Sequence, residues 1–234
     1  MKSTPVTANS TQLTRLGFVN CYLVRESDGL TLIDTGLPNS HHDILAAAQT
    51  LGAPIRRILL THPHMDHVGS VDALIENLSP EVEFVSNARS LPLLQKPPDM
   101  SLQSDEAQTK LKGGVSGIKS RPRRLVHDNE LIGSFRVIDT PGHIPGHIAF
   151  LDERDGTLYA GDALVAKGYL TVSGFAPWFF PLPNFGTWDK PTALVSARKL
   201  LTYPIERFAC GHGAVKTGGI ATLQAAIAKA DKTN

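Results

Sequence analysis

The sequence predicts an α+β fold in four layers, an αββα sandwich in which two β-sheets pack face to face with helices outside. Two β-rich stretches, at 11–33 and 124–161, show the short apolar runs and turn residues that are typical of strands. Segments with helical periodicity follow each stretch. Because the second stretch resembles a repeat of the first, each half is expected to supply one sheet and its helices.

The first half opens with a predicted β-meander. Its strands are at 11–16, 20–24 and 29–33, with a hairpin-type turn at 26–29. The segments that follow are predicted as a helix at 40–51, a strand at 57–61, a helix at 71–78, a strand at 82–85 and a short helix at 87–94. These elements make up the first sheet and its helices.

An irregular insertion is predicted at about 95–124. Prolines and glycines break the pattern there, and residues 96–124 carry seven Lys or Arg against three acids. A loop of this length inside a compact domain is usually functional or mobile. It is expected either to lie over or beside the site or to form a solvated excursion with one helix around 105–111.

The second half returns to strands and ends in helices. Strands are predicted at 124–127, 134–139, 147–151 and 156–161, and helices at 189–201 and 219–230. In the same half, six aromatic residues fall within fourteen positions: Phe175, Trp178, Phe179, Phe180, Phe185 and Trp188. With interleaved prolines they could wall an apolar substrate pocket. The alternative is a loop that plugs the core or forms a homodimer interface.

Length and composition indicate one globular domain, residues 1–234. The 234 residues are 41% hydrophobic and 19% charged, ordinary values for a globular chain. A net charge of +1 argues against a nucleic-acid partner, no apolar run reaches the roughly 18 residues of a membrane span, and the first ten residues are too polar for a signal peptide. We therefore expect a cytoplasmic protein that acts on a small molecule, with Cys21 and Cys210 as reduced, buried thiols.

The stretch His62-Pro63-His64-Met65-Asp66-His67 packs four potential metal ligands into six residues. Side chains alternate on an extended segment, so His62 and His64 leave the end of the strand at 57–61 on the same side. Asp66 and His67 come at the start of the next helix and point elsewhere. Chance would give this pattern in roughly one chain in a thousand of this composition. Two ligands facing one way and two another predict a pair of neighbouring metal ions.

Four further motifs accompany it: Leu32-Ile33-Asp34-Thr35-Gly36, Thr140-Pro141-Gly142-His143, Ala160-Gly161-Asp162 and Cys210-Gly211-His212. Together, and in this order, they resemble the metallo-β-lactamase-fold hydrolase superfamily, in its glyoxalase II and lactonase-like branch. True β-lactamases mostly have Cys where this chain has Asp162.

The resemblance implies a dinuclear centre. Its predicted metal ligands are His62, His64, Asp66, His67, His143, Asp162 and His212, with Asp162 bridging the two ions. Asp34 is implied to hold the histidine loop, although without the resemblance it would be taken as a strand-end Asp that accepts from turn amides. His147 opens an apolar strand and is expected to support the ligands from behind them.

Nitrogen and carboxylate ligands without thiolates suit two Zn²⁺ ions, and Mn²⁺, Fe²⁺ or Co²⁺ could occupy the same set. The predicted activity is hydrolysis of a carboxylic ester, lactone or thioester by a metal-bridging hydroxide, with Asp66 and Asp162 as the catalytic carboxylates.

Three alternatives remain at this point. The first is a phosphodiesterase or ribonuclease, and the others are a β-lactamase and a non-catalytic metal-binding module. Glyoxalase II adds a C-terminal helical domain, whereas about 22 residues follow His212. Lactonases commonly place a Tyr three residues after the bridging Asp to bind the carbonyl oxygen. This chain has Val165 there, and Lys167 and Tyr169 are the residues expected to bind the carbonyl oxygen instead.

Overall fold

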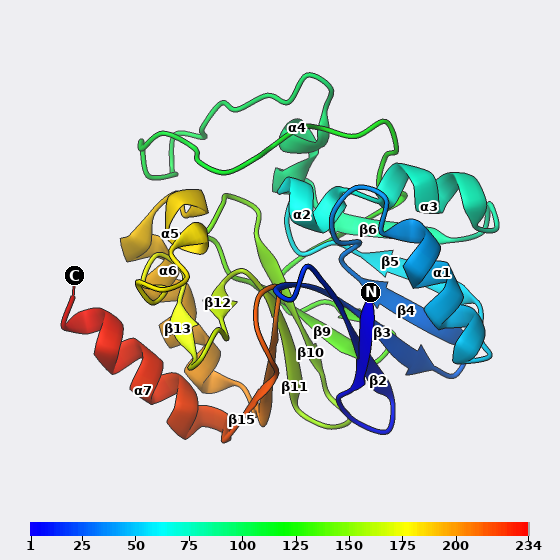
Figure 1. Ribbon diagram of the computed structural model, residues 1–234. Coiled ribbons are helices and arrows are strands. Elements are labelled where there is room, and N and C mark those ends of the chain that lie inside the picture. The colour runs from blue at the N-terminus through cyan, green and yellow to red at the C-terminus, as the bar shows by residue number, and fades with distance from the viewer. Residues whose placement is uncertain (234) are drawn as a thin grey trace. The chain divides into compact units, whose positions relative to one another are not determined.

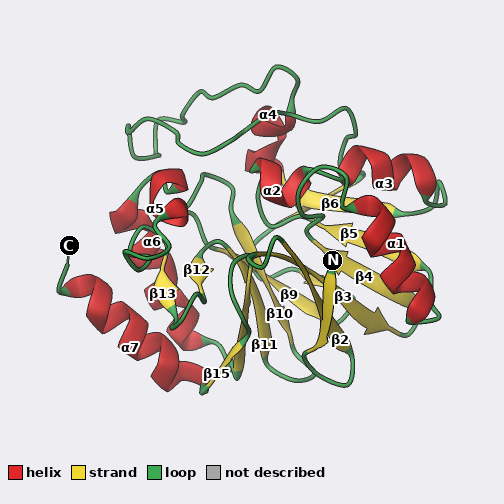
Figure 2. Cartoon of the chain, in the orientation of Figure 1, coloured by secondary structure: helices red, strands yellow, loops and turns green. Residues whose placement is uncertain are grey.

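The computed structural model describes residues 1–233, which divide into two compact units. The first comprises 1–99 and 115–126, and the second comprises 100–114 and the residues from 127 onward. Each contains its own β-sheet with helices against it (Figures 1 and 2).

A seven-stranded sheet forms the first unit, in the order β1-β2-β3-β4-β5-β6-β7. Its strands are β1 (Lys2–Pro5), β2 (Ser10–Arg15), β3 (Val19–Glu26), β4 (Gly29–Ile33), β5 (Ile55–Leu59), β6 (Glu83–Asn87) and β7 (Arg124–Val126). Strands β1 to β4 are antiparallel, and β4 to β7 are parallel to one another. The change follows from the connections, because parallel neighbours need a crossover and α1 provides the first one.

The helices of the first unit are α1 (His41–Thr50), α2 (Met65–Val68), α3 (Val71–Asn77), the 3₁₀ turn η1 (Ala88–Ser90) and α4 (Leu91–Leu94). Ile44 of α1 and Leu74 of α3 pack with Leu32 and Ile58 of the sheet in one buried apolar cluster.

At the β3–β4 hairpin, Gly29 has φ +147°, and a Cβ there would lie 2.6 Å from the Pro54 carbonyl oxygen. The predicted meander and its turn are therefore confirmed in place.

The second unit holds a six-stranded sheet in the order β15-β14-β11-β10-β9-β8, and a two-stranded pair β12-β13. Its strands are β8 (Leu131–Ile132), β9 (Phe135–Asp139), β10 (Ile148–Asp152), β11 (Thr157–Gly161), β12 (Leu164–Val165), β13 (Thr171–Val172), β14 (Arg207–Cys210) and β15 (Lys216–Thr217). Its helices are α5 (Leu182–Gly186), α6 (Lys190–Lys199), η2 (Leu200–Thr202) and α7 (Gly219–Asp231). Residues of α6 and α7 share one apolar cluster with β9, β10, β11 and β14.

The prediction missed β14, which pairs in parallel with β11. Its four residues are too few to show a period, and Phe208, Ala209 and Cys210 are all fully buried. It also missed the edge strand β1 and the helix α5 inside the aromatic stretch.

The predicted insertion has no helix or strand from 95 to 123 within the described chain, so no helix forms at 105–111. Its return leg is fixed to α3, because the Asp72 carboxylate accepts hydrogen bonds from the backbone N–H groups of Lys119 (3.0 Å) and Ser120 (2.8 Å). Burial would raise the pKa of Asp72, but these two backbone donors, the Ser120 hydroxyl and the Lys119 charge together lower that pKa. In the second unit, the Trp188 indole N–H donates to the Thr109 carbonyl oxygen at 3.1 Å.

Among residues 1–233, no helix is both long and apolar enough to cross a membrane.

Cys21 and Cys210 are fully buried, and burial raises the pKa of both thiols.

Candidate metal centre

The histidine motif begins three residues after β5 ends, because the strand ends at Leu59 and not at Thr61 as predicted. The His62 and His64 rings meet edge to face with centroids 4.8 Å apart, and the His62 and His67 centroids are 4.0 Å apart. All three imidazoles are buried. Asp66, in the first turn of α2, is 29% exposed and places a carboxylate oxygen 3.9 Å from His67 Nε2. The motif therefore gathers three imidazoles and one accessible carboxylate.

Asp34 organises this motif from the end of β4. It adopts the left-handed conformation (φ +57°), which Asp tolerates better than most residues, and its N–H donates to the Leu59 carbonyl at 2.9 Å. Its buried carboxylate accepts from the Thr61 N–H at 2.9 Å, from the Thr61 hydroxyl at 2.8 Å, and from His67 Nδ1 at 2.8 Å. Such a convergence of donors on one carboxylate fixes the loop between β5 and α2.

The directions of these hydrogen bonds fix two tautomers. The Thr61 hydroxyl gives its only proton to Asp34, so its oxygen accepts the proton on His62 Nδ1, 3.0 Å away. A carboxylate can only accept, so His67 also carries its proton on Nδ1. Both neutral rings then hold their lone pair on Nε2, the form in which histidine binds metal ions.

In the second unit, two strand ends bring a carboxylate and a histidine together. Asp162 follows β11 and His212 follows β14, and these strands are parallel neighbours whose carboxyl ends share one edge. An Asp162 Oδ2 atom lies 3.1 Å from His212 Nε2 and 3.5 Å from His143 Nε2. One carboxylate oxygen thus faces two buried imidazole nitrogens, as a bridging ligand would.

His143 lies in the Pro/Gly loop between β9 and β10. Gly142 has φ +132°, and a Cβ there would lie 2.2 Å from the Ala193 nitrogen of α6, so only glycine allows this approach. His147 plays another part: its Nε2 accepts the Asp162 N–H at 3.1 Å, and its Nδ1–H donates to the Thr140 hydroxyl at 2.8 Å. With both ring nitrogens engaged, His147 holds Asp162 in place and is not placed as a ligand.

The predicted pocket residues of the aromatic segment (175–188) occupy different environments. Phe180 is buried with its ring centroid 5.7 Å from that of His212, and Lys167 Nζ lies 5.5 Å from the Phe180 centroid. Phe175 is partly buried against the core of the second unit. Trp178 (89%), Phe179 (50%) and Phe185 (71%) are exposed.

Tyr169 faces α7 rather than these residues. The Lys229 ammonium lies 3.5 Å from the Tyr169 ring centroid, and both residues line a hollow of about 420 Å³. Of the two stand-ins considered for the lactonase Tyr, Lys167 is therefore the one grouped with a predicted ligand. The pocket assignment itself stays a prediction.

Sequence reasoning missed the hydroxyl groups that hold the histidines: Thr61, Thr140, Ser173 and Thr187. The first stands next to His62, and a Thr that ends a strand beside a histidine is the signal that could have found it. Ser173 and Thr187 are 30 and 44 residues from His143, so no local pattern marks them.

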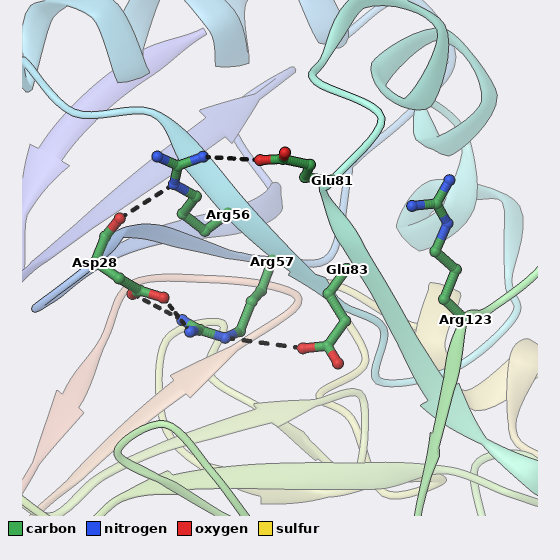
Figure 3. Close-up of a pocket in the computed structure, with 6 residues that line it drawn as sticks. All are labelled: Asp28, Arg56, Arg57, Glu81, Glu83 and Arg123. Atoms are coloured by element: carbon green, nitrogen blue, oxygen red, sulfur yellow. Dashed lines mark hydrogen bonds and ion pairs between the residues drawn. The ribbon is translucent and has the colours of Figure 1, made fainter.

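A second charged site lies at the start of β5, the strand end opposite the histidine motif. It is a hollow of about 410 Å³ lined by three acids and three arginines: Asp28, Glu81, Glu83, Arg56, Arg57 and Arg123. Figure 3 shows Arg57 between Asp28 and Glu83, and Arg56 directed at Glu81, while Arg123 stands apart from them. Its charges balance, so it offers no excess of positive charge for an anion.

Comparison with known proteins places the chain in a family. A model of the metallo-β-lactamase superfamily matches residues 14–212. YobT of Bacillus subtilis is 45% identical over 215 residues, covering 92% of this chain and 91% of that protein. Hydroxyacylglutathione hydrolase of Rhodospirillum rubrum is 30% identical over 197 residues, covering 82% of this chain but only 60% of the relative.

Two solved structures share the fold. BLEG-1, a B3 metallo-β-lactamase, superposes with a TM-score of 0.67 at 21% identity, covering 91% of this chain and 95% of that one. TTHA1623 in a di-iron-bound form gives a TM-score of 0.63 at 30% identity, covering 92% and 95%. The predicted α+β fold of the αββα class is confirmed.

The chain belongs to the metallo-β-lactamase superfamily, a class of metal-dependent hydrolases. Its histidine and aspartate groups have the chemistry that divalent cations require.

Proposed function

We propose that this protein is a dinuclear metal-dependent hydrolase of carboxylic esters, lactones or thioesters. In this proposal His62, His64 and His143 hold one ion, Asp66, His67 and His212 hold the other, and Asp162 bridges them. The donor set of imidazoles and carboxylates fits Zn²⁺, and the di-iron form of TTHA1623 is a reason to test iron as well.

The observation that carries the proposal is the protonation pattern of the buried histidines. His62 and His67 donate from Nδ1 to Thr61 and Asp34, so each presents a lone pair on Nε2. A neutral imidazole with its proton on Nδ1 and its lone pair on Nε2 is the form in which histidine binds a divalent cation. The Thr61 hydroxyl and the Asp34 carboxylate behind the two rings hold them in this form and raise the basicity of Nε2.

When bound, two divalent ions would lower the pKa of a water molecule and polarise a carbonyl group. The residues of this chain supply the rest. Asp66, partly exposed at the first turn of α2, is placed to orient the attacking water and accept its proton. Lys167, beside Phe180 and His212, offers a cation for the carbonyl oxygen as negative charge develops on it.

An acyl substrate is favoured over a phosphodiester for two reasons. The relative from Rhodospirillum rubrum is named as a hydrolase of hydroxyacylglutathione, although this chain spans only 60% of it. The insertion is also a poor phosphate-binding arm, because Arg121 donates to the Leu94 carbonyl at 3.1 Å and Arg123 donates to the Pro80 carbonyl. Two of its basic side chains are thus engaged in holding the first unit together.

Metal analysis followed by a substrate panel tests the proposal. The protein, purified without chelator and incubated with Zn²⁺, Mn²⁺ or Fe²⁺, should bind close to two ions per chain. The panel would contain an acyl-homoserine lactone, an aryl ester, S-lactoylglutathione, a penicillin and bis(p-nitrophenyl) phosphate. The highest kcat/KM is expected for an ester, lactone or thioester.

Asp162→Ala is the matched variant, because loss of a shared ligand should lower occupancy at both positions. One ion or fewer in the wild-type protein after loading would refute the dinuclear centre. A preference for the phosphodiester that falls steeply with added salt would refute the acyl substrate class and support a phosphodiesterase instead. Preference for the penicillin would likewise refute the substrate class.

A further inference from the structure

Two buried hydroxyl groups connect His143 to the aromatic segment. Ser173 follows β13, and Thr187 is the C-cap residue that follows α5; both are buried. Ser173 Oγ lies 2.9 Å from His143 Nδ1 and 2.9 Å from Thr187 Oγ1. The Thr187 hydroxyl in turn lies 2.7 Å from the carbonyl oxygen of Pro183. Four residues from three separate stretches of the sequence therefore form one chain of hydrogen bonds.

Only one direction of proton donation is consistent with this chain. The Pro183 carbonyl can only accept, so Thr187 gives it its single hydroxyl proton. Thr187 must then accept from Ser173, and Ser173, whose proton is now used, must accept from His143 Nδ1–H. His143 is thereby fixed with its lone pair on Nε2, the atom that faces Asp162.

The far end of the chain is itself well anchored. Pro183 belongs to α5, and the next residue, Asn184, accepts the Ala176 N–H at 2.7 Å and donates to the Ala176 carbonyl at 3.0 Å. The backbone makes a second connection, since the Trp188 N–H donates to the His143 carbonyl at 2.8 Å. The aromatic segment is thus fastened both to itself and to the loop that carries His143.

We propose that Ser173 and Thr187 are positioning residues that set the tautomer of His143, and that the aromatic segment, through the Pro183 carbonyl of α5, is the element on which this setting depends. The role of His143 as a metal ligand rests on the proposed function, whereas its tautomer does not. A displacement of α5 would let Ser173 turn its proton toward His143 Nδ1. That would place the imidazole proton on Nε2 and block metal binding there.

Histidine ¹H–¹⁵N long-range correlation spectra of the full chain at pH 8, without metal, test the tautomer, with the His143 signal assigned by a His143→Gln variant. The wild type should show His143 protonated on Nδ1. Thr187→Val keeps the shape but removes the hydroxyl, and should shift His143 toward protonation on Nε2. Thr187→Ser restores a hydroxyl and should rescue the wild-type signal.

Thr157→Val is the matched control, because the buried Thr157 hydroxyl has no hydrogen-bond partner among the described residues. Zn²⁺ affinity, measured by competition with a chelator, should fall about 10- to 100-fold in Thr187→Val and Ser173→Ala, and by less than twofold in Thr187→Ser and the control. Asn184→Ala, which loosens α5, should shift the tautomer in the same direction by a smaller amount.

A wild-type His143 protonated on Nε2, or a Thr187→Val protein with the tautomer and affinity of the control, would overturn the proposal. An Asn184→Ala protein identical to the control would overturn the dependence on the aromatic segment. If the wild type has the expected tautomer but binds no metal, the proposed function fails and the positioning of His143 stands.

Discussion

Replacing Asp34 by Asn should weaken the binding of one of the two proposed metal ions and leave the other ion bound. In the native loop the backbone N–H of Thr61 donates to one carboxylate oxygen, and His67 Nδ1 donates to the other. A backbone N–H cannot reverse, so the side-chain amide introduced by Asp34→Asn must keep its oxygen toward Thr61 and turn its NH₂ group toward His67. His67 would then have to place its proton on Nε2, the atom proposed to bind metal.

The expected result is selective. The Thr61 hydroxyl can still donate to the amide oxygen, so the tautomer of His62 is preserved. Affinity for the ion proposed to bind His67 should fall about 10- to 100-fold, while the ion proposed to bind His62 stays bound. Because shape and most contacts are kept, the free energy of unfolding of the metal-free protein should fall by only about 1–2 kcal/mol.

Asp34→Ala provides the comparison in magnitude. It leaves three buried donors, two on Thr61 and one on His67, without their acceptor. Each buried unsatisfied group costs about 1–3 kcal/mol, and entering water relieves part of this cost. The free energy of unfolding of the metal-free protein should therefore fall by about 3–5 kcal/mol.

Urea unfolding of metal-free protein and Zn²⁺ competition titrations measure the two effects. Thr61→Val is the matched control, because it removes the partner of His62 and should weaken the other ion. An Asp34→Asn protein that binds both ions as tightly as the wild type would refute the tautomer argument. So would equal weakening of both ions.

Three further predictions concern other parts of the chain. Asp72→Ala should lower the free energy of unfolding by about 0.5–1.5 kcal/mol at pH 7, because two backbone donors lose a partly exposed carboxylate. Since the pKa of Asp72 is lowered in the folded state, its contribution is present above the unfolded-state pKa and lost as the pH falls through the folded-state value. The difference from wild type in unfolding titrations should therefore vanish in acid, and a constant difference would contradict the assignment. Trp178→Ala should raise KM for long-chain or ring-bearing substrates by a factor worth about 1–3 kcal/mol and hardly change small esters, whereas equal effects on both would indicate a structural role. Cys21 and Cys210, whose thiol pKa values are raised by burial, should resist a disulfide reagent in the native protein and react after unfolding; rapid native labelling would contradict their burial.

The sequence predicted the parts of the site that depend on local geometry. Two histidines with one residue between them on an extended segment must leave it on the same side, and the His62 and His64 rings do meet just beyond the end of β5. The approach of Asp162 to His212 depends instead on the parallel pairing of β11 with β14. That pairing could not be predicted, because four residues of β14 carry too little periodicity to identify a strand and nothing local specifies its neighbour.

The groups behind the proposed ligands could not be predicted for a different reason. Ser and Thr are common, and a hydroxyl donates or accepts equally well, so composition cannot say which ones face a histidine. Their direction is decided at the far end of each network. Asp34 ends one network and the Pro183 carbonyl ends the other, and both are groups that only accept.

A hydroxyl carries a single proton, so an acceptor at the end of the network fixes every donor back to the imidazole. In a buried network a reversed group would leave two donors facing each other without water to separate them, which costs more than the hydrogen bond itself. The tautomers of His62, His67 and His143 are thus set by the Asp34 carboxylate and the Pro183 carbonyl, which lie outside the proposed ligand set. It follows that a donor placed at the end of a network should reverse the tautomer of the imidazole, whereas deleting the end group only releases it. This is why Asp34→Asn is a sharper test of the proposed site than Asp34→Ala.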